Sequence, residues 1–349
     1  MKIAQLGFYG TNTGDSAALY NIRKFFPKDT EWTSIHMESQ GSARQPIYEI
    51  VNFFLDANVK YDMILVGGAG LVEGGKWNTA TTGWKLPFNK QILDIISIPI
   101  VVFGVGFNFF RGMEKLNSEG KKNLSLLIDK AKLFSVRNDG SYEELMKAVK
   151  PSKYIYEIMD AGGMQDIELP QKSEMKIGCF NPTMNGGQCW DSRNVPLQEL
   201  VEVIQSHKMK AHTHSPKAYC SAYRELDYII PKDIFMNNLK EDFQRNIEIY
   251  NDVDFIVPMH QHGQLFSFGK NIPYISIASM EKMVNQDKKF GLEDYTVDTS
   301  LDNWVSILDE KITRLKTDAN YLKRWYDIRT EKIDDIKIAF KHFCKKVIE

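Results

Sequence analysis

Apolar residues follow two kinds of spacing along the first 170 residues, and segments of the two kinds alternate. Short apolar runs have the length of buried strands and occupy residues 2–8, 61–70, 98–106 and 133–139. The segments between them show helical spacing, for example from Tyr142 to Val149. Ser141 and Glu144 match a capping box, which predicts a helix that begins beside them. Strands that alternate with helices predict a parallel sheet with helices on both faces.

The pattern breaks at residues 167–176, a polar stretch that contains Pro170. A second series of apolar runs follows at residues 175–182, 209–215, 254–260 and 272–278. From Leu301 onward the pattern is helical and highly charged. We therefore predict an α/β protein with two Rossmann-like, doubly wound domains in tandem, the GT-B-like architecture of many glycosyltransferases, with C-terminal helices crossing back. The predicted ranges are 1–170, 171–300 and 301–349. Ligands of such sheets bind at the carboxyl ends of the strands, here in a cleft between the domains.

Composition narrows the classes of protein further. The 349 residues are 43% hydrophobic and 26% charged, which is typical of a globular protein. The net charge of −1 gives no bulk attraction to nucleic acid. The uncharged run at residues 95–110 is shorter than the ~20 residues that span a bilayer, and the N-terminus has no signal-peptide pattern. The four cysteines form no C-x-x-C pair and are interpreted as free thiols, so we expect a cytoplasmic protein.

Glycine-rich turns follow three of the predicted strands, at residues 7–14, 66–75 and 103–107. Glycines let a ligand approach the backbone closely, and a helix N-terminus offers free N–H groups. Three such turns at one edge of a sheet predict the floor of a binding cleft. For residues 7–14 the ordinary alternative is a tight turn in which Asp15 caps the following helix.

Histidines form two H-x-H pairs, His212 with His214 and His260 with His262, each near the end of a predicted strand. Residues two apart on a strand share a face, so each pair could act as a unit. Zinc sites usually add a cysteine or a carboxylate at characteristic spacing, and no such residue is found. The sequence therefore favours an anion or a sugar over a metal as the ligand of these histidines.

Arg137 stands at another predicted strand end, directly before the helix that begins near Ser141. A guanidinium there could hold a carboxylate or a phosphate through two parallel hydrogen bonds. The ordinary alternative is an arginine that pairs with Asp139 or Glu143, and taken alone the residue favours that alternative. Arg137 becomes a site candidate only together with the other motifs.

Taken in order, these motifs resemble the polysaccharide pyruvyl transferase family. Residues 7–19 resemble its glycine- and asparagine-containing turn, and residues 62–71 resemble its Asp-x-x-φ-x-Gly-Gly-Gly-x-Leu segment, with Ala69 in place of one glycine. Residues 136–145 and 260–277 are similar to its two later motifs. The resemblance covers most of the chain from Met1 to Tyr295. Its main departure is His260, where the family often has an arginine.

The resemblance implies an enzyme, a transferase that moves a pyruvyl group from phosphoenolpyruvate to hydroxyls of a sugar. The sugar would belong to a surface polysaccharide, such as a capsule or exopolysaccharide, or to its lipid-linked oligosaccharide precursor. His262 matches the histidine proposed as general acid in the family. The family's arginine is implicated in holding the donor's carboxylate or phosphate. A histidine at position 260 could do so when protonated, or with help from Arg137, Arg193 or Lys217. The scheme requires no cofactor and no metal.

The candidate residues divide between the two ligands that the resemblance implies. The donor side is expected in the second domain and includes His260, Gly263, Gln264, Asn181, His212, His214 and Lys217, together with Arg137 of the first domain. The acceptor side is expected in the first domain and includes Gly10, Asn12, Gly14, Asp15, Gly67, Gly68, Gly70 and Gly106. Under this hypothesis a side chain at Gly14 would impair use of the acceptor more than binding of the donor.

Two other functions remain open at this point. A glycosyltransferase of the same fold would use a nucleotide sugar, but retaining enzymes of that fold often carry acidic residues beside a glycine-rich loop of the second domain. The comparable stretch at residues 262–273 has no such carboxylate before it. A binding module without catalytic activity is less consistent with the glycine-rich turns and the clustered histidines.

The C-terminal segment carries one further expectation. Trp304, Ile307 and Leu308 form an apolar stripe that repeats at Ile312 and Leu315, and we predict that these helices pack onto the first domain. The alternative is a solvated, charged tail. Lysines near the end could make a peripheral contact with the inner membrane surface, because anionic lipids attract such clusters.

Overall fold

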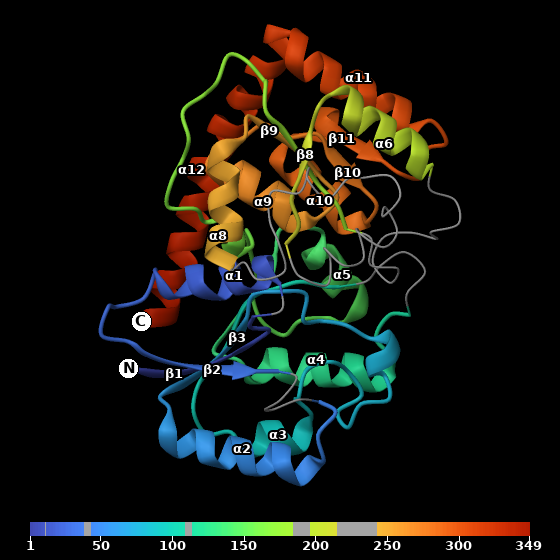
Figure 1. Ribbon diagram of the computed structural model, residues 1–349. Coiled ribbons are helices and arrows are strands. Elements are labelled where there is room, and N and C mark those ends of the chain that lie inside the picture. Colours follow the sequence, from blue (N-terminus) through green and yellow to red (C-terminus); the bar gives the residue numbers. More distant parts are fainter. Residues whose placement is uncertain (11, 38–42, 109–113, 184–195, 215–242) are drawn as a thin grey trace. The chain divides into compact units, whose positions relative to one another are not determined.

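The computed structural model describes residues 1–10, 12–37, 43–108, 114–183, 196–214 and 243–349 (Figure 1). Contacts between Cα atoms divide it into two compact units, each described by itself below. Unit 1 consists of Met1–Tyr9, Ala18–Ala161 and Ile338–Glu349, and unit 2 consists of Gly10–Ala17 and Gly162–Lys337. The predicted domain ranges, and the assignment of acceptor and donor to them, remain predictions. Predicted site residues Lys217 and Arg193 lie outside the described residues.

Unit 1 is built on a parallel sheet of six strands in the order β2-β1-β3-β4-β5-β6. The strands are β1 (Lys2–Gly7), β2 (Glu31–His36), β3 (Met63–Gly67), β4 (Ile100–Val105), β5 (Leu133–Arg137) and β6 (Tyr156–Ile158). Every residue of β3 and β4 is buried, which explains why these strands read as continuous apolar runs. The chain passes from β1 to β2 on one side and then to β3 on the other. The order therefore reverses between β1 and β3.

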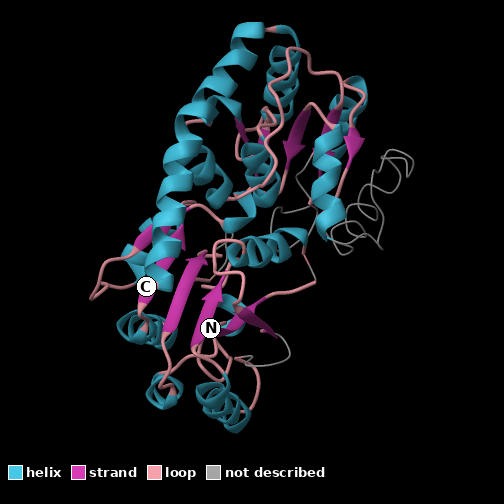
Figure 2. Ribbon diagram, turned by 90° about the vertical axis from the view of Figure 1, so that its left-hand side faces the viewer, coloured by secondary structure: helices cyan, strands magenta, loops and turns pink. Residues whose placement is uncertain are grey.

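Helices cover both faces of this sheet (Figure 2). On one face, neighbouring helices α2 (Ile47–Lys60), α3 (Lys90–Ile95) and α4 (Ser118–Lys130) bury their apolar side chains. The last residues of α12 (Ala319–Ile348) belong to unit 1, where Phe340 and Phe343 lie edge-on to Phe103 at ring distances of 5.4 and 5.1 Å.

The remaining helices of unit 1 include α1 (Thr13–Arg23), which is shared with unit 2, and α5 (Ser141–Ala148). The predicted capping box at α5 is wrong. Gly140 is the N-cap, with a φ of +88° that suits glycine, and the Ser141 hydroxyl is not a cap. It donates to Asp139 and accepts from the N–H of Phe107, so it ties the helix start to the end of β4. Tertiary partners thus replace the local cap.

Unit 2 has a parallel sheet of three strands in the order β8-β7-β9. The strands are β7 (Gly178–Asn181), β8 (Lys210–Ala211) and β9 (Phe255–Pro258). A parallel pair, β10 (Ser276–Ala278) and β11 (Thr296–Asp298), continues the arrangement through a bridge between Ile256 and Tyr274. The helices are α6 (Leu197–Ser206), α8 (Phe243–Glu248), α9 (Gln261–Lys270), α10 (Glu281–Phe290), α11 (Trp304–Thr317) and most of α12.

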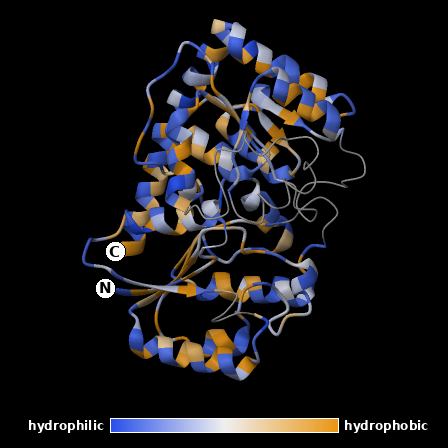
Figure 3. Ribbon diagram, in the orientation of Figure 1, coloured by the Kyte–Doolittle hydropathy of each residue, from blue (hydrophilic) through white to orange (hydrophobic). Residues whose placement is uncertain are grey.

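The apolar stripe of α11 is buried within unit 2. Trp304, Leu308, Ile312 and Leu315 are buried, and the helix packs against α6 and β11. The expected packing of the C-terminal helices onto the first domain remains a prediction. Hydrophilic and hydrophobic residues alternate along α11, as expected of a helix with one buried face (Figure 3). None of the helices in the described ranges is long and apolar enough to cross a membrane.

Candidate functional site

Two histidine pairs meet because of the strand order in unit 2. β7 pairs in parallel with both β8 and β9, so the residues that follow β8 and β9 emerge at the same edge of the sheet. His212 and His214 follow β8, and His260 precedes α9, whose first turn contains His262. We call these four residues the histidine cluster. They are neighbours in space although the two pairs lie far apart in the sequence.

The rings of the histidine cluster form a continuous chain of contacts. Ring centroids are separated by 5.5 Å between His212 and His214, 5.3 Å between His214 and His260, and 6.0 Å between His260 and His262. Tyr250 shares a hydrogen bond of 2.7 Å with Nε2 of His214. Phe266, one turn further along α9, lies 5.3 Å from His214 and 6.0 Å from His262. The aromatic rings of Tyr250 and Phe266 thus pack against the imidazoles.

Burial makes at least two of these histidines neutral near pH 7. It lowers the pKa of His214 well below its ordinary value, and positive charge on His260, His212 and His262 lowers it further. Burial, followed by His262 and Lys282, lowers the pKa of His260 to about 3. His260 therefore offers an anion a neutral N–H donor in the free protein, and a negatively charged ligand would favour its protonated form.

The glycine turn at residues 10–17 belongs to unit 2 and lies directly against the histidine cluster. A Cβ atom placed on Gly14 would lie 2.1 Å from Cγ and Nδ1 of the His262 ring, so only glycine leaves room for that ring. The N–H of Thr13 donates to the carbonyl of His214 at 2.8 Å, and Asn246 donates to the Thr13 hydroxyl at 3.0 Å. The structure thus brings Gly14 to the predicted general acid.

Asn12 has a structural role in the same turn. Its side-chain oxygen accepts hydrogen bonds from the N–H groups of Gly14 and Asp15 at 2.8 and 3.4 Å, and it is therefore the N-cap of α1. The alternative in which Asp15 caps the helix is wrong. Gly10 has a φ of +76° with open space where a side chain would project, and its N–H donates to the Ser16 hydroxyl. The turn needs these residue types for its own geometry.

Three further donor-side candidates lie on α9 or pack against it. A Cβ on Gly263 would lie 2.7 Å from Oδ1 of Asn181, and Asn181 donates through Nδ2 to the carbonyl of His212. Gln264 instead donates to Ser276 and Asp287, both at 2.8 Å. The Gln264 amide therefore joins α9 to β10 and α10, and it is not directed to the histidine cluster.

Arg137 belongs to unit 1, where two carboxylates neutralise it. Its guanidinium lies 3.2 Å from Asp139 and 2.8 Å from Asp160, and the side chain is 1% exposed. A Cβ on Gly106 would lie 1.9 Å from Nη2 of Arg137, so this glycine makes room for the guanidinium. These contacts match the ordinary alternative, an arginine that pairs with Asp139, and they explain why Gly106 is a glycine.

The glycines at the end of β3 and directly after it allow close packing in unit 1. A Cβ on Gly67 would lie 2.2 Å from the Phe103 carbonyl, and one on Gly70 would lie 2.8 Å from the Asn108 side chain. Gly68 has a φ of +68°. Ala69 has a φ of +80°, a conformation that an L-residue adopts rarely. This is the position at which the family motif has a glycine, so the chain keeps the backbone shape without the usual residue.

Sequence reasoning missed several members of this region. Tyr250 lies in a short 3-10 helix at Ile249–Asp252, and Thr13 and Asn246 fix the glycine turn to the histidine cluster. Their neighbours in sequence give no periodic signal that sets them apart. In the described ranges no group of three or more His, Cys, Asp or Glu side chains is arranged to hold a metal ion.

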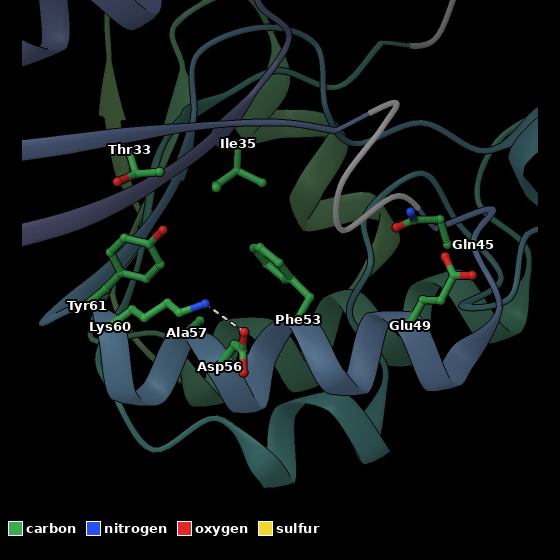
Figure 4. Close-up of a pocket in the computed structure, with 9 residues that line it drawn as sticks. All are labelled: Thr33, Ile35, Gln45, Glu49, Phe53, Asp56, Ala57, Lys60 and Tyr61. Atoms are coloured by element: carbon green, nitrogen blue, oxygen red, sulfur yellow. Dashed lines mark hydrogen bonds and ion pairs between the residues drawn. The ribbon is translucent and has the colours of Figure 1, made fainter.

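A cavity of about 360 Å³ lies in unit 1, between α2 and the edge strand β2 (Figure 4). Thr33, Ile35, Gln45, Glu49, Phe53, Asp56, Ala57, Lys60 and Tyr61 line it. None of these is a predicted site residue. Lys60 pairs with Asp56 at 2.7 Å, so the cavity carries a paired charge at its rim and no cluster of reactive groups.

Comparison with known proteins identifies relatives at two levels. The sequence profile of the family described as polysaccharide pyruvyl transferase matches residues 12–279, which is most of the chain. The predicted resemblance to that family is therefore confirmed. No curated protein matches the sequence.

Solved structures share the fold at low sequence identity. Anabaena HepE in complex with UDP and glucose has a TM-score of 0.59 at 10% identity, over 99% of both chains. The UDP-GlcNAc 2-epimerase of Neisseria meningitidis, bound to UDP-GlcNAc, has a TM-score of 0.54 at 11% identity, over 100% of both chains. S. aureus MnaA with UDP has a TM-score of 0.53 at 12% identity, over 94% of this chain and 90% of that one. These likenesses confirm the predicted α/β, GT-B-like fold class.

Proposed function

Because the chain belongs to the polysaccharide pyruvyl transferase family, we propose that it transfers a pyruvyl group from phosphoenolpyruvate to hydroxyls of a sugar. The sugar belongs to a surface polysaccharide or to its lipid-linked precursor. The observation that carries the proposal is the histidine cluster, with His262 in the first turn of α9 and Gly14 against its ring. The family supports the choice of reaction, and the geometry of the histidine cluster supports the choice of residues.

His262 serves as the general acid in this proposal. It protonates the methylene carbon of phosphoenolpyruvate, and cationic character then develops at C2. A sugar hydroxyl attacks C2, the bond between C2 and the phosphate oxygen breaks, and a second hydroxyl closes the ketal. Two hydroxyl protons are released in total. One restores the proton that His262 gave to the new methyl group, and the other leaves on the phosphate.

The donor carries roughly three negative charges, and the N-terminus of α9 offers it a favourable electrostatic environment. The positive end of the dipole of this ten-residue helix lies beside His260 and His262. Nδ1 of His260 and Nδ1 of His214 accept or donate no hydrogen bond among the described residues. Each is therefore available to a carboxylate or phosphate oxygen, and Tyr250 fixes the ring of His214 through the other nitrogen.

The histidine at position 260 changes how the donor's charge is balanced. An arginine would bring a permanent positive charge, whereas His260 is neutral in the free protein because its pKa is lowered to about 3. The donor's negative charge raises that pKa when it binds. We therefore expect phosphoenolpyruvate to bind together with a proton, a linkage that the arginine-bearing members of the family would lack.

A ligand panel tests the proposal with the full-length chain. Phosphoenolpyruvate should raise the melting temperature, and at 100 times its Kd a ligand stabilises the folded state by about 2.7 kcal/mol. Released inorganic phosphate should then depend on an added sugar acceptor. If phosphoenolpyruvate gave neither stabilisation nor product while a nucleotide sugar gave both, the protein would be a glycosyltransferase of the same fold. Calorimetry in buffers of different ionisation enthalpy measures the proton uptake.

A further inference from the structure

The strand order in the sheet of unit 1 points to a position where parallel sheets commonly bind ligands. The strand order reverses between β1 and β3, and the connections from these strands leave in opposite directions. In open parallel sheets this reversal leaves a crevice at the carboxyl ends of the two strands, and ligands bind there. In this chain the residues at that position are Phe8, which follows β1, and Gly68–Glu73, which follow β3.

A nearly buried ion pair occupies this position. Nζ of Lys85 lies 2.6 Å from Oε2 of Glu73, and the two side chains are 11% and 6% exposed. Lys85 also donates to the carbonyl of Gly70 at 3.1 Å and lies 4.6 Å from the centroid of the Phe8 ring. Removing two charges from water is costly, and such a pair often adds little stability. A buried pair at a strand-order reversal is therefore a candidate for binding.

The carboxylate of Glu73 is only half used. Lys85 and Asn108 both donate to Oε2, at 2.6 and 3.5 Å, and no described residue donates to Oε1. Lys85 fixes the carboxylate from one side and leaves the second oxygen available as an acceptor. A ligand hydroxyl is the natural donor to such an oxygen, because it can also accept a hydrogen bond from a neighbouring ammonium or amide group.

Aromatic rings surround the ion pair. The Trp77 ring centroid is 5.9 Å from Nζ of Lys85, and the guanidinium carbon of Arg44 lies 4.1 Å from the same centroid. Trp77 is buried, and its Nε1 has no hydrogen-bond partner among the described residues. Ligand sites combine apolar walls with a few fixed polar groups, and this position has both.

The charge balance distinguishes the two ligands of the reaction. Glu73 already neutralises Lys85, so a phosphate or a carboxylate at this ion pair would meet the carboxylate of Glu73. An uncharged polyol has no such conflict. Resting on the proposed function, we propose that Glu73 and Lys85 bind hydroxyls of the acceptor sugar in unit 1, against Phe8 and Trp77. The ligand is a hexose unit with free hydroxyl groups.

Glycoside binding tests the proposal without requiring turnover. Methyl glycosides of glucose, galactose and mannose are added to the full-length chain, and binding is measured by saturation-transfer NMR. At least one should bind the wild type, and Glu73→Gln should weaken that binding by tenfold or more. Glu144→Gln is the matched control, because it removes a carboxylate that pairs with Lys115 and Lys147 elsewhere in unit 1.

A double variant guards against a folding defect. Glu73→Gln with Lys85→Met removes both charges and keeps most of the side-chain volume, so no uncompensated charge is left. It too should lose glycoside binding, while the melting-temperature rise caused by phosphoenolpyruvate stays at the wild-type value. Unchanged glycoside binding in either variant, or no binding of any glycoside to the wild type, would overturn the proposal. Failure of phosphoenolpyruvate alone would instead count against the proposed function.

Discussion

Two groups of buried polar side chains lie at the carboxyl ends of parallel strands. One group keeps its charge and pairs it with opposite charges, and the other group becomes uncharged. In unit 1, Arg137 keeps its charge and is matched by Asp139 and Asp160. In unit 2, burial lowers the pKa of His214 and of His260, the positive charge of neighbouring histidines and of Lys282 lowers it further, and these rings become neutral instead. The charge of Arg137 is thus balanced by carboxylates of the protein, whereas the two histidines have lost their charge.

This difference is the basis on which we propose a structural role for Arg137 and a ligand-binding role for the histidine cluster. A guanidinium with two carboxylates has no attraction left for an anion, and removing it would leave two buried negative charges. Neutral imidazoles can take up a proton when an anion arrives, which gives a gain that the free protein does not have. We therefore propose that Arg137 stabilises unit 1 and that the histidine cluster binds the donor.

The largest expected effect is on turnover. His262→Ala removes the proposed general acid and should lower kcat by ~10²–10⁴-fold, the usual contribution of a general acid. The matched control is His207→Gln, since His207 pairs with Asp309 away from the histidine cluster. The measurement is steady-state release of phosphate with the wild-type melting temperature as a check on folding. Near wild-type turnover in a folded His262→Ala protein would mean that the acid is a different residue.

The next largest effect is expected at Arg137, on the stability of the folded protein. Arg137→Met should lower the free energy of unfolding by about 3–5 kcal/mol, because Asp139 and Asp160 would be left without their cation. Lys90→Met removes an exposed partner of Asp94 and should cost less than about 1 kcal/mol. Urea denaturation measures both. If the Arg137→Met protein were as stable as the wild type but phosphoenolpyruvate no longer raised its melting temperature, Arg137 would be a donor-binding residue.

The fold class could be predicted from the sequence because buried parallel strands are short apolar runs and the helices between them carry amphipathic stripes. Even the short strand β8 (Lys210–Ala211) could be located, as part of the predicted apolar run at residues 209–215 that contains His212 and His214. The apolar stripe of α11 could be recognised as well, but not that α6 and β11 pack against it. Periodicity tells which face of a helix is buried and contains no information on what covers that face.

The candidate site could be predicted only where its signal is local. His260 and His262 are visible in the sequence, and so is Asp139 as a partner of Arg137. Asp160, Tyr250 and the contact between Gly14 and His262 depend on which strands are neighbours in the sheet. Glycine in a turn has several causes, and the cause at Gly14 is a ring from a distant part of the chain.

The third prediction tests that contact. Gly14→Ala would force the His262 ring away from its position, because the new Cβ would lie 2.1 Å from it, and we expect turnover to fall by tenfold or more. Gly120→Ala is the matched control in the first turn of α4, where the nearest atom is Cδ2 of Leu116 at 3.1 Å. If Gly14→Ala raised only the KM for the acceptor, the acceptor role expected from the sequence would hold instead.

The smallest effect is the pH dependence of stability, which reports the neutral state of the cluster directly. In the unfolded chain a histidine titrates near its ordinary pKa of about 6.5, whereas folded His260 titrates at about 3. Between these values the unfolded state binds more protons. Stability should therefore be fully present above about pH 6.5 and should fall as the pH drops, by up to about 1.4 kcal/mol per pH unit for each such histidine.

A buried carboxyl in the same unit contributes to stability with the opposite pH dependence, and it makes the test specific. Burial raises the pKa of Asp287 to about 7, although Tyr274, Thr296 and Gln264 donate to it. Its unfolded pKa is about 3.9, so it contributes stability that is lost as the pH rises toward 7. His260→Gln should reduce the loss of stability on acidification, and Asp287→Asn should steepen it. Thermal unfolding between pH 4 and 8 measures both slopes. Parallel curves for wild type and His260→Gln would mean that this ring is not held neutral, and that the contrast with Arg137 does not explain the donor site.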